Sequence, residues 1–130
     1  MSFIQLPSAA SAIYSSTAST SGTLTTTNGT PASAASVALS DDTVYMFDVT
    51  VAGRRTDSAG YFACKINAAY RRTGGGSATL LSTDSFDFST GSDTGYTVSM
   101  GVSGNSMVVF AIGAVGHTIN WSIAVVGVQA

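Results

Sequence analysis

The sequence predicts an all-β protein, an antiparallel β-sandwich or jelly-roll-like domain with an extended N-terminal arm. Three observations support this fold class. All seven acidic residues are Asp, Glu is absent and Lys occurs once, while Ser, Thr and Gly are abundant, so the composition disfavours helices. Apolar and polar residues alternate along much of the chain after residue 43, with the period of a strand. Turn signals separate these segments every 8 to 12 residues or so, a spacing typical of sandwiches and barrels.

Charge divides the chain into two parts. Residues 1–40 carry no charged side chain, whereas all charges lie in residues 41–130. The first part lacks the high charge of a typical disordered tail and is not apolar enough to fold alone. We therefore expect an extended Ser/Thr/Ala-rich arm over 1–40, ordered by pairing with a neighbour, and a β-sandwich domain over 41–130. The candidate contact residues of the arm are Phe3, Ile4, Leu6 and Tyr14.

A hairpin opens the second part. Strands are expected over 43–51 and 61–70, joined by a loop over 52–60 that contains Gly53 and Gly60. The alternation assigns these residues to the apolar faces: Tyr45, Phe47, Val49 and Val51 in the first strand, and Phe62, Cys64, Ile66, Ala68 and Tyr70 in the second.

Four further strands follow at short intervals. They are expected over 77–82, 96–102, 107–112 and 117–128. A polar connection over 84–94 separates the first two, and Ser103-Gly104-Asn105-Ser106 predicts a tight hairpin between the next two. In the last strand Ile119, Trp121, Ile123 and Val125 are in phase, so we assign Trp121 to the core rather than to a sugar-stacking surface.

The first hairpin would bring arginines close to aspartates at both of its ends. Arg71 and Arg72 would lie near Asp41 and Asp42, and Arg54 and Arg55 would lie near Asp57. Surface ion pairs of this kind contribute less than about 1 kcal/mol each. At the loop tip, contacts between subunits are an equally good explanation, so Arg54, Arg55 and Asp57 are candidate interface residues.

The overall charge limits the partners. Only 9% of residues are charged, against about 25% in typical proteins, so exposed positions are uncharged or hidden in contacts with other chains. A net charge of −2 and a pI near 4.8 disfavour nucleic-acid binding. No secretory signal is expected. Residues 107–128 are long enough to span a membrane, but glycines and polar residues near their middle favour two strands and a turn, so no membrane partner is expected.

No motif identifies a reaction, a cofactor or a metal. The single cysteine, Cys64, excludes an intrachain disulfide and a Cys-based zinc site, and it is expected to be buried. Asp84, Asp87 and Asp93 do not form a calcium-binding loop, and no Gly-x-Ser-x-Gly sequence is present. We therefore expect a non-enzymatic protein without catalytic, cofactor or metal residues. A small hydrolase with the only histidine, His117, as its base remains a further hypothesis.

Three stretches resemble the small β-domains of tailed-bacteriophage virion proteins, such as capsid decoration proteins, head fibres and the terminal domains of tail fibres. They are Val44 to Asp57 with its Arg-Arg-Thr-Asp loop, Gly60 to Ile66, and Gly104 to Val125 with its Ile-Asn-Trp final strand. The resemblance covers roughly residues 43–128.

The resemblance implies a structural or adhesive protein of the virion, commonly a homotrimer, on the outer surface of the phage head or fibre. Because the chain has a short arm and no repetitive shaft, we expect a capsid decoration (cement) protein whose arm binds the major capsid protein or another virion protein. The alternative is a tail- or head-fibre adhesin that binds a host cell-surface glycan through the loops at 53–59 or 71–76.

Overall fold

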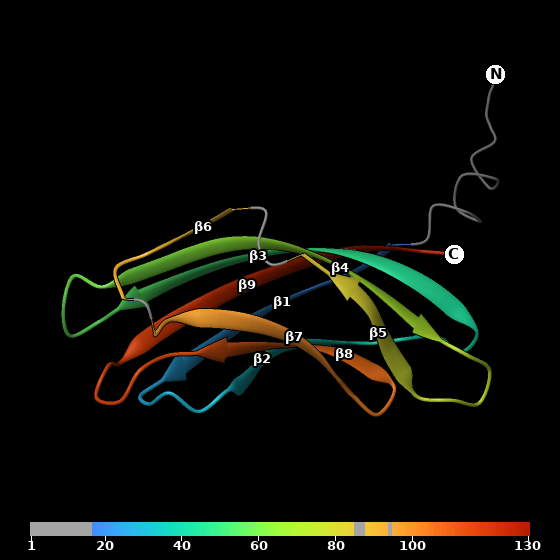
Figure 1. The fold of residues 1–130 in the computed structure, drawn as a ribbon, viewed down its shortest axis with the longest axis horizontal. Coiled ribbons are helices and arrows are strands. Elements are labelled where there is room, and N and C mark those ends of the chain that lie inside the picture. Colours follow the sequence, from blue (N-terminus) through green and yellow to red (C-terminus); the bar gives the residue numbers. More distant parts are fainter. Residues whose placement is uncertain (1–16, 85–87, 94) are drawn as a thin grey trace, which may run out of the picture.

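Two antiparallel β-sheets packed face to face make up the molecule (Figure 1). The structure is a computed structural model, and it describes residues 17–84, 88–93 and 95–130. These residues form β1 (Thr17–Thr26), β2 (Ala32–Ala38), β3 (Thr43–Arg55), β4 (Tyr61–Arg72), β5 (Ala78–Thr83), β6 (Phe88–Gly91), β7 (Thr97–Ser103), β8 (Ser106–Ile112) and β9 (Ile119–Gln129). The predicted all-β antiparallel sandwich is confirmed.

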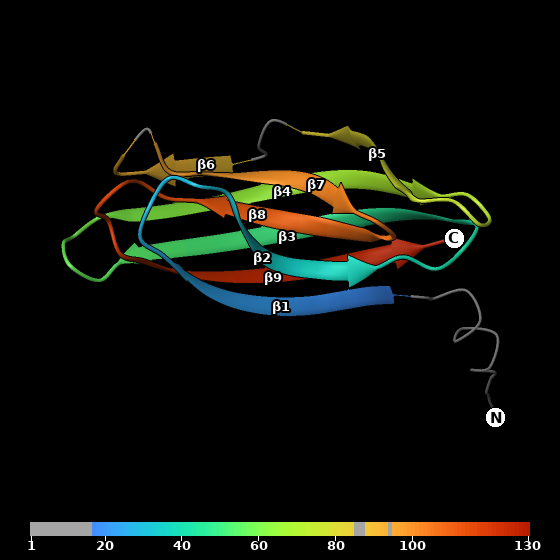
Figure 2. The ribbon, with the colours of Figure 1, turned by 90° about the horizontal axis from the view of Figure 1, so that it is seen from below.

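The larger sheet has the strand order β1-β9-β3-β4-β5, with β6 also paired to β4. The smaller sheet has the order β2-β8-β7 and lies over the middle of the larger one (Figure 2). The first described strand therefore pairs with the last, from Thr17 opposite Val128 to Thr26 opposite Ile119. This pairing places β1 at one edge of the larger sheet, beside the last strand of the chain.

The core lies between the sheets and follows from the alternation. In β3 every second residue from Tyr45 to Gly53 is buried, and β4 and β9 show the same period. Aromatic rings fill the centre: the ring centroids of Phe47 and Tyr70 are 5.7 Å apart, and those of Phe62 and Trp121 are 5.9 Å apart. The Tyr70 hydroxyl donates to the carbonyl oxygen of Gly101 at 2.9 Å, which links β4 to β7 in the other sheet.

The boundary predicted at residue 40, between an arm and a domain, falls between strands that belong to the same two sheets. Of the predicted arm, residues 17–26 and 32–38 are strands that complete the two sheets, β1 beside β9 and β2 beside β8. Their few apolar residues suffice because each strand pairs along its length with a strand that carries core side chains, β9 or β8. Phe3, Ile4, Leu6 and Tyr14 lie outside the described residues.

Two other predictions concern the polar connection over 84–94 and the apolar stretch over 107–128. Four residues of the polar connection over 84–94 form the short strand β6, which pairs with β4 between Phe62 and Lys65. Residues 107–128 contain most of β8, a loop and most of β9. In 17–84, 88–93 and 95–130, no helix is long and apolar enough to cross a membrane.

Candidate functional site

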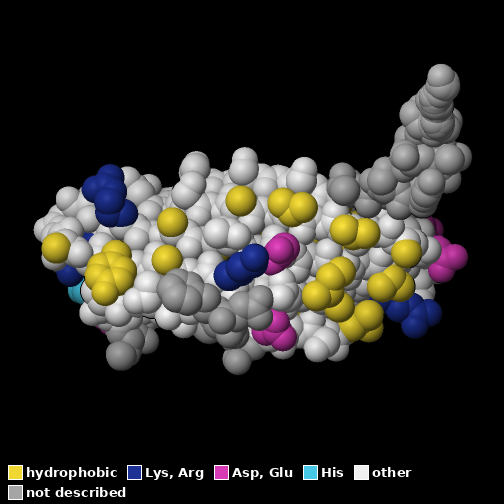
Figure 3. Space-filling model, turned by 90° about the horizontal axis from the view of Figure 1, so that it is seen from above, with side chains coloured by type: hydrophobic (Ala, Val, Ile, Leu, Met, Phe, Trp, Pro, Cys, Tyr) yellow, Lys and Arg dark blue, Asp and Glu magenta, His cyan; other side chains and the backbone are white. Residues whose placement is uncertain are grey.

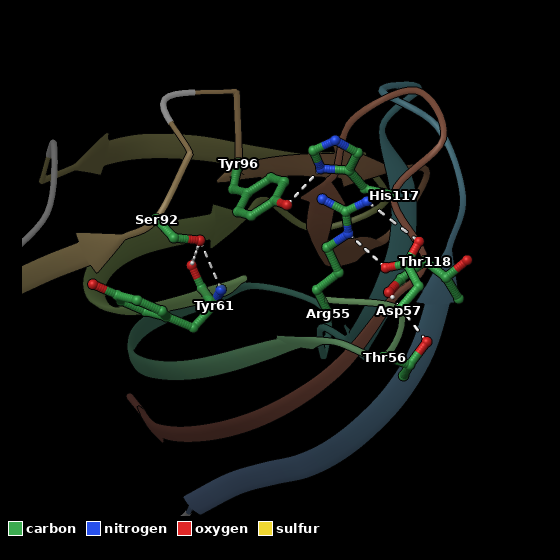
Figure 4. Close-up of polar contacts among 8 residues, drawn as sticks. All are labelled: Arg55, Thr56, Asp57, Tyr61, Ser92, Tyr96, His117 and Thr118. Atoms are coloured by element: carbon green, nitrogen blue, oxygen red, sulfur yellow. Dashed lines mark hydrogen bonds and ion pairs between the residues drawn. The ribbon is translucent and has the colours of Figure 1, made fainter. Parts of the chain in front are cut away.

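Three loops meet at one end of the sandwich, which we call the loop end. They are the β3–β4 loop (56–60), the β6–β7 connection (92–96, of which 94 is not described) and the β8–β9 loop (113–118) (Figure 4). Backbone hydrogen bonds hold them together. The amide of Thr56 donates to the carbonyl of Thr118 at 2.9 Å, and the amide of Ser92 donates to the carbonyl of Tyr61 at 2.9 Å. Segments far apart in sequence thus form one surface.

Arg55 and Asp57 form a two-pronged ion pair on this surface. The guanidinium Nε lies 2.5 Å from one carboxylate oxygen of Asp57, and a terminal nitrogen lies 3.3 Å from the other. The hydrogen bond from Arg55 lowers the pKa of Asp57 below its ordinary value of 3.8, and the same bond raises the pKa of Arg55. The arginine is therefore charged and held in one orientation.

Tyr96 and His117 form a second fixed pair. The Tyr96 hydroxyl lies 2.5 Å from Nδ1 of His117, and the two rings meet edge to face with centroids 5.6 Å apart. Tyr96 is buried, whereas His117 is partly exposed. When the hydroxyl donates to Nδ1, the neutral imidazole carries its proton on Nε2.

A groove of about 290 Å³ opens between these pairs. Its lining combines one guanidinium, one carboxylate, hydroxyl groups and two aromatic rings. The lining residues are Arg55, Ser58, Ala59, Gly60, Ser92, Asp93, Tyr96 and His117. Asp93 accepts the amide hydrogen of Gly95 through Oδ1 at 2.7 Å, and Ser92 Oγ accepts the amide hydrogen of Tyr61 at 2.8 Å. Such a set can bind a polar, hydroxyl-rich ligand through hydrogen bonds and stacking.

Arg54 belongs to a different surface. Neighbouring strand residues point to opposite faces, so Arg54 faces outward from the larger sheet while Arg55 faces the groove. Arg54 lines a shallow depression of about 780 Å³ on that outer face, together with Thr23, Thr25, Asn120 and Ser122. The sequence grouped Arg54, Arg55 and Asp57, and the structure brings only Arg55 and Asp57 together.

The predicted ion pairs at the opposite end form in part. Arg72 Nε lies 3.5 Å from Asp41 Oδ1, and the Arg72 guanidinium also donates to the carbonyls of Leu39 and Gly76. No ion pair joins Arg71 or Asp42 to another residue in the described part of the chain. Arg72 therefore ties together the loops before β3 and after β4.

Four groove residues were not expected to act together: Ser92, Asp93, Tyr96 and His117. In the sequence, His117 was considered only as an isolated base and Asp93 only as a calcium ligand. Asp93 and His117 lie 24 residues apart in the sequence. Only the pairing of β7 with β8 and of β4 with β6 brings their loops together. Within the described residues, no three His, Cys or Asp side chains gather as metal ligands.

No family model and no curated protein matches the chain, whereas solved structures do. The chain is similar to the tailspike protein of Acinetobacter baumannii phage AM24, with 9% identity and a TM-score of 0.48, over 85% of this chain and 26% of that one. It is also similar to tailspike protein gp49 of Acinetobacter baumannii bacteriophage Fri1, a capsular polysaccharide depolymerase, with 11% identity and a TM-score of 0.41, over 91% of this chain and 20% of that one. The chain thus spans about a quarter or less of either tailspike.

One of these comparisons corrects a prediction from the sequence. The chain was predicted not to be an enzyme; the Fri1 tailspike, which it resembles in fold over part of that protein, is a capsular polysaccharide depolymerase, so this exclusion is withdrawn. The sequence contains no local catalytic motif. The loop end instead gathers Asp93, Tyr96 and His117 from two separate loops, a combination that no local motif reveals.

Proposed function

We propose that this chain is a β-sandwich module of a phage tail fibre or tailspike that binds a host cell-surface polysaccharide in the groove at the loop end. The observation that carries this proposal is the lining of the groove. A fixed arginine, a carboxylate, serine hydroxyls and a tyrosine–histidine pair offer hydrogen bonds and ring faces to a sugar chain.

A role as a capsid decoration protein is less well supported. That role required residues 1–40 to be an arm available to a partner. Residues 17–26 and 32–38 are instead strands of the sandwich and are not free to act as an arm. Both solved structures described above are tailspikes.

The test is polysaccharide binding by groove variants. Purified capsular polysaccharides are titrated against the full chain by calorimetry, and Asp93→Asn is compared with wild type. Loss of a charged hydrogen-bonding group costs about 1.5–3 kcal/mol, so the dissociation constant should rise by about 10- to 100-fold. Asp42→Asn makes the same chemical change at an exposed position at the opposite end and should bind as wild type does.

Equal affinities for wild type and Asp93→Asn would show that the groove does not bind the polysaccharide. The same incubations also report on catalysis through the release of reducing ends. Cleavage that His117→Gln abolishes would assign catalysis to the groove as well.

A further inference from the structure

The outer face of the larger sheet is the other large surface of the molecule, and it is seen face-on in Figure 3. Apolar side chains gather on it most densely at the end where the C-terminus and the β4–β5 connection lie. Four of them are about half exposed: Val44 and Met46 from β3, and Val126 and Val128 from β9. The register places Met46 between Val128 and Ala69 on the two neighbouring strands, so these side chains form one continuous patch.

The patch arises from a pattern shared by two strands that are far apart in sequence. The outward residues of β3 are apolar at its start and polar at its end, from Val44 to Arg54. Those of β9 run the opposite way, from Asn120 to Val128. Because the strands are antiparallel, both apolar halves fall at the same end of the sheet. Strands that are apolar on both faces are typical of sheets covered on both sides, and the described chain covers only the inner face.

Charged side chains do not favour exposure of the middle of this face to water. Asp48 and Lys65 lie near its middle, where Lys65 Nζ is 3.6 Å from Asp48 Oδ2. The centre of the face therefore carries no net charge. The outward side chains of the edge strand β1 include Ser19, Ser21, Thr23 and Thr25, and no charge protects this edge. Exposed edge strands of natural proteins are usually protected from pairing with another chain, often by charged side chains.

The size of the face matches a stable protein interface. It is five strands wide, and its long strands contain 10 to 13 residues. With a spacing of about 4.8 Å between strands and about 3.3 Å per residue, it covers about 800 Å². Standard interfaces bury about 800 Å² on each partner.

We propose that the outer face of the larger sheet is the contact surface between copies of this chain. A second copy fits because the face is broad, and because its centre carries no net charge and so does not repel the same centre on another copy. The apolar patch supplies the core of the contact, and Arg54 and Arg71 lie toward its ends, where polar rim residues are usual. Such a face can meet one copy about a two-fold axis or two copies about a three-fold axis. The groove at the loop end stays open in both arrangements.

Sedimentation equilibrium of the full chain tests this surface. Wild type should form a complex of two or three copies at micromolar concentration. Val126→Glu places a charge in the contact and should raise the dissociation constant by about 100-fold or more. Val115→Glu is the matched control, because Val115 is 83% exposed in the loop before β9, at the loop end. It should leave the complex unchanged.

A labelling experiment keeps the test independent of stability. Met46→Cys should react slowly with a maleimide in the complex and fast on dilution, whereas Val115→Cys should react fast throughout. The native Cys64 does not interfere, because burial raises the pKa of its thiol to about 11. A monomeric wild type would overturn the proposal, and so would equal effects of both Glu variants. A chain of residues 17–130 should still assemble; dissociation on removal of residues 1–16 would assign the contact to that segment instead.

Discussion

Apart from the core tyrosines, Trp121 and Cys64, Thr26 is the only buried residue with a polar side chain in the described part of the chain, and it has a clear partner. Its hydroxyl oxygen accepts the indole hydrogen of Trp121 at 2.9 Å, which satisfies the one polar group of the largest core side chain. Sequence periodicity placed Trp121 in the core. It could not supply this partner, because Thr26 lies 95 residues away on a strand that was assigned to an arm.

Replacing this hydroxyl should destabilise the sandwich. In Thr26→Val the shape is kept but the indole N–H loses its acceptor in a buried site, which should cost about 1–3 kcal/mol of unfolding free energy. Urea denaturation measures the loss. Thr25→Val is the matched control on the exposed face and should change stability by less than about 0.5 kcal/mol. A loss of the same size in both variants would show that the buried hydrogen bond is not its cause.

The ion pair between Arg55 and Asp57 makes a pH-dependent prediction. Because Arg55 lowers the pKa of Asp57 in the folded state, the pair stabilises the loop above pH 3.8 and its contribution is lost as the pH falls below that value. An NMR titration of the Asp57 carboxyl carbon should therefore give a midpoint below 3.8. In Arg55→Gln the midpoint should move back up toward 3.8. An unchanged midpoint would mean that the arginine does not set it.

At the scale of the elements, strands with clear alternation were predicted well and strands without it were not. The six predicted strands correspond to β3, β4, β5, β7, β8 and β9, with ends that differ by a few residues. β1 and β2 consist mainly of Ser, Thr and Ala, so their own sequences contain little periodicity. They are strands because β9 and β8 offer open edges beside them. Tertiary pairing of this kind is not encoded locally.

Deletion of these two strands should destroy the fold. A chain of residues 41–130 lacks β1 and β2, which leaves only the β7–β8 hairpin of the smaller sheet and removes the acceptor of Trp121. Isolated two-stranded hairpins are marginally stable. Near-ultraviolet circular dichroism and urea denaturation should show no cooperative transition for this chain, whereas residues 17–130 should unfold cooperatively. Cooperative unfolding of residues 41–130 at the midpoint of the full chain would restore the predicted domain boundary.

At the scale of the whole molecule, the fold class followed from the sequence but the site did not. Composition and spacing were enough for an antiparallel sandwich. The groove depends on which loops meet, and that depends on strand order, which periodicity does not contain. The contact between Arg55 and Asp57 could be predicted from the sequence because the two residues are only two positions apart. Tyr96 and His117 were missed as a pair because the pairing of β7 with β8 brings them together.

The register of β1 and β9 also has a mechanical consequence. Thr17 lies opposite Val128, so both ends of the described chain leave from the same end of the sandwich, far from the groove (Figure 1). A pull that separates these two ends would open the β1–β9 hydrogen bonds one after another, like a zipper. A pull between a ligand in the groove and the C-terminus runs along the strands and loads many hydrogen bonds in shear together, because these bonds are perpendicular to the strands. The module is thus strongest along the line that joins the groove to the C-terminus, which is the direction of pull that the proposed function implies.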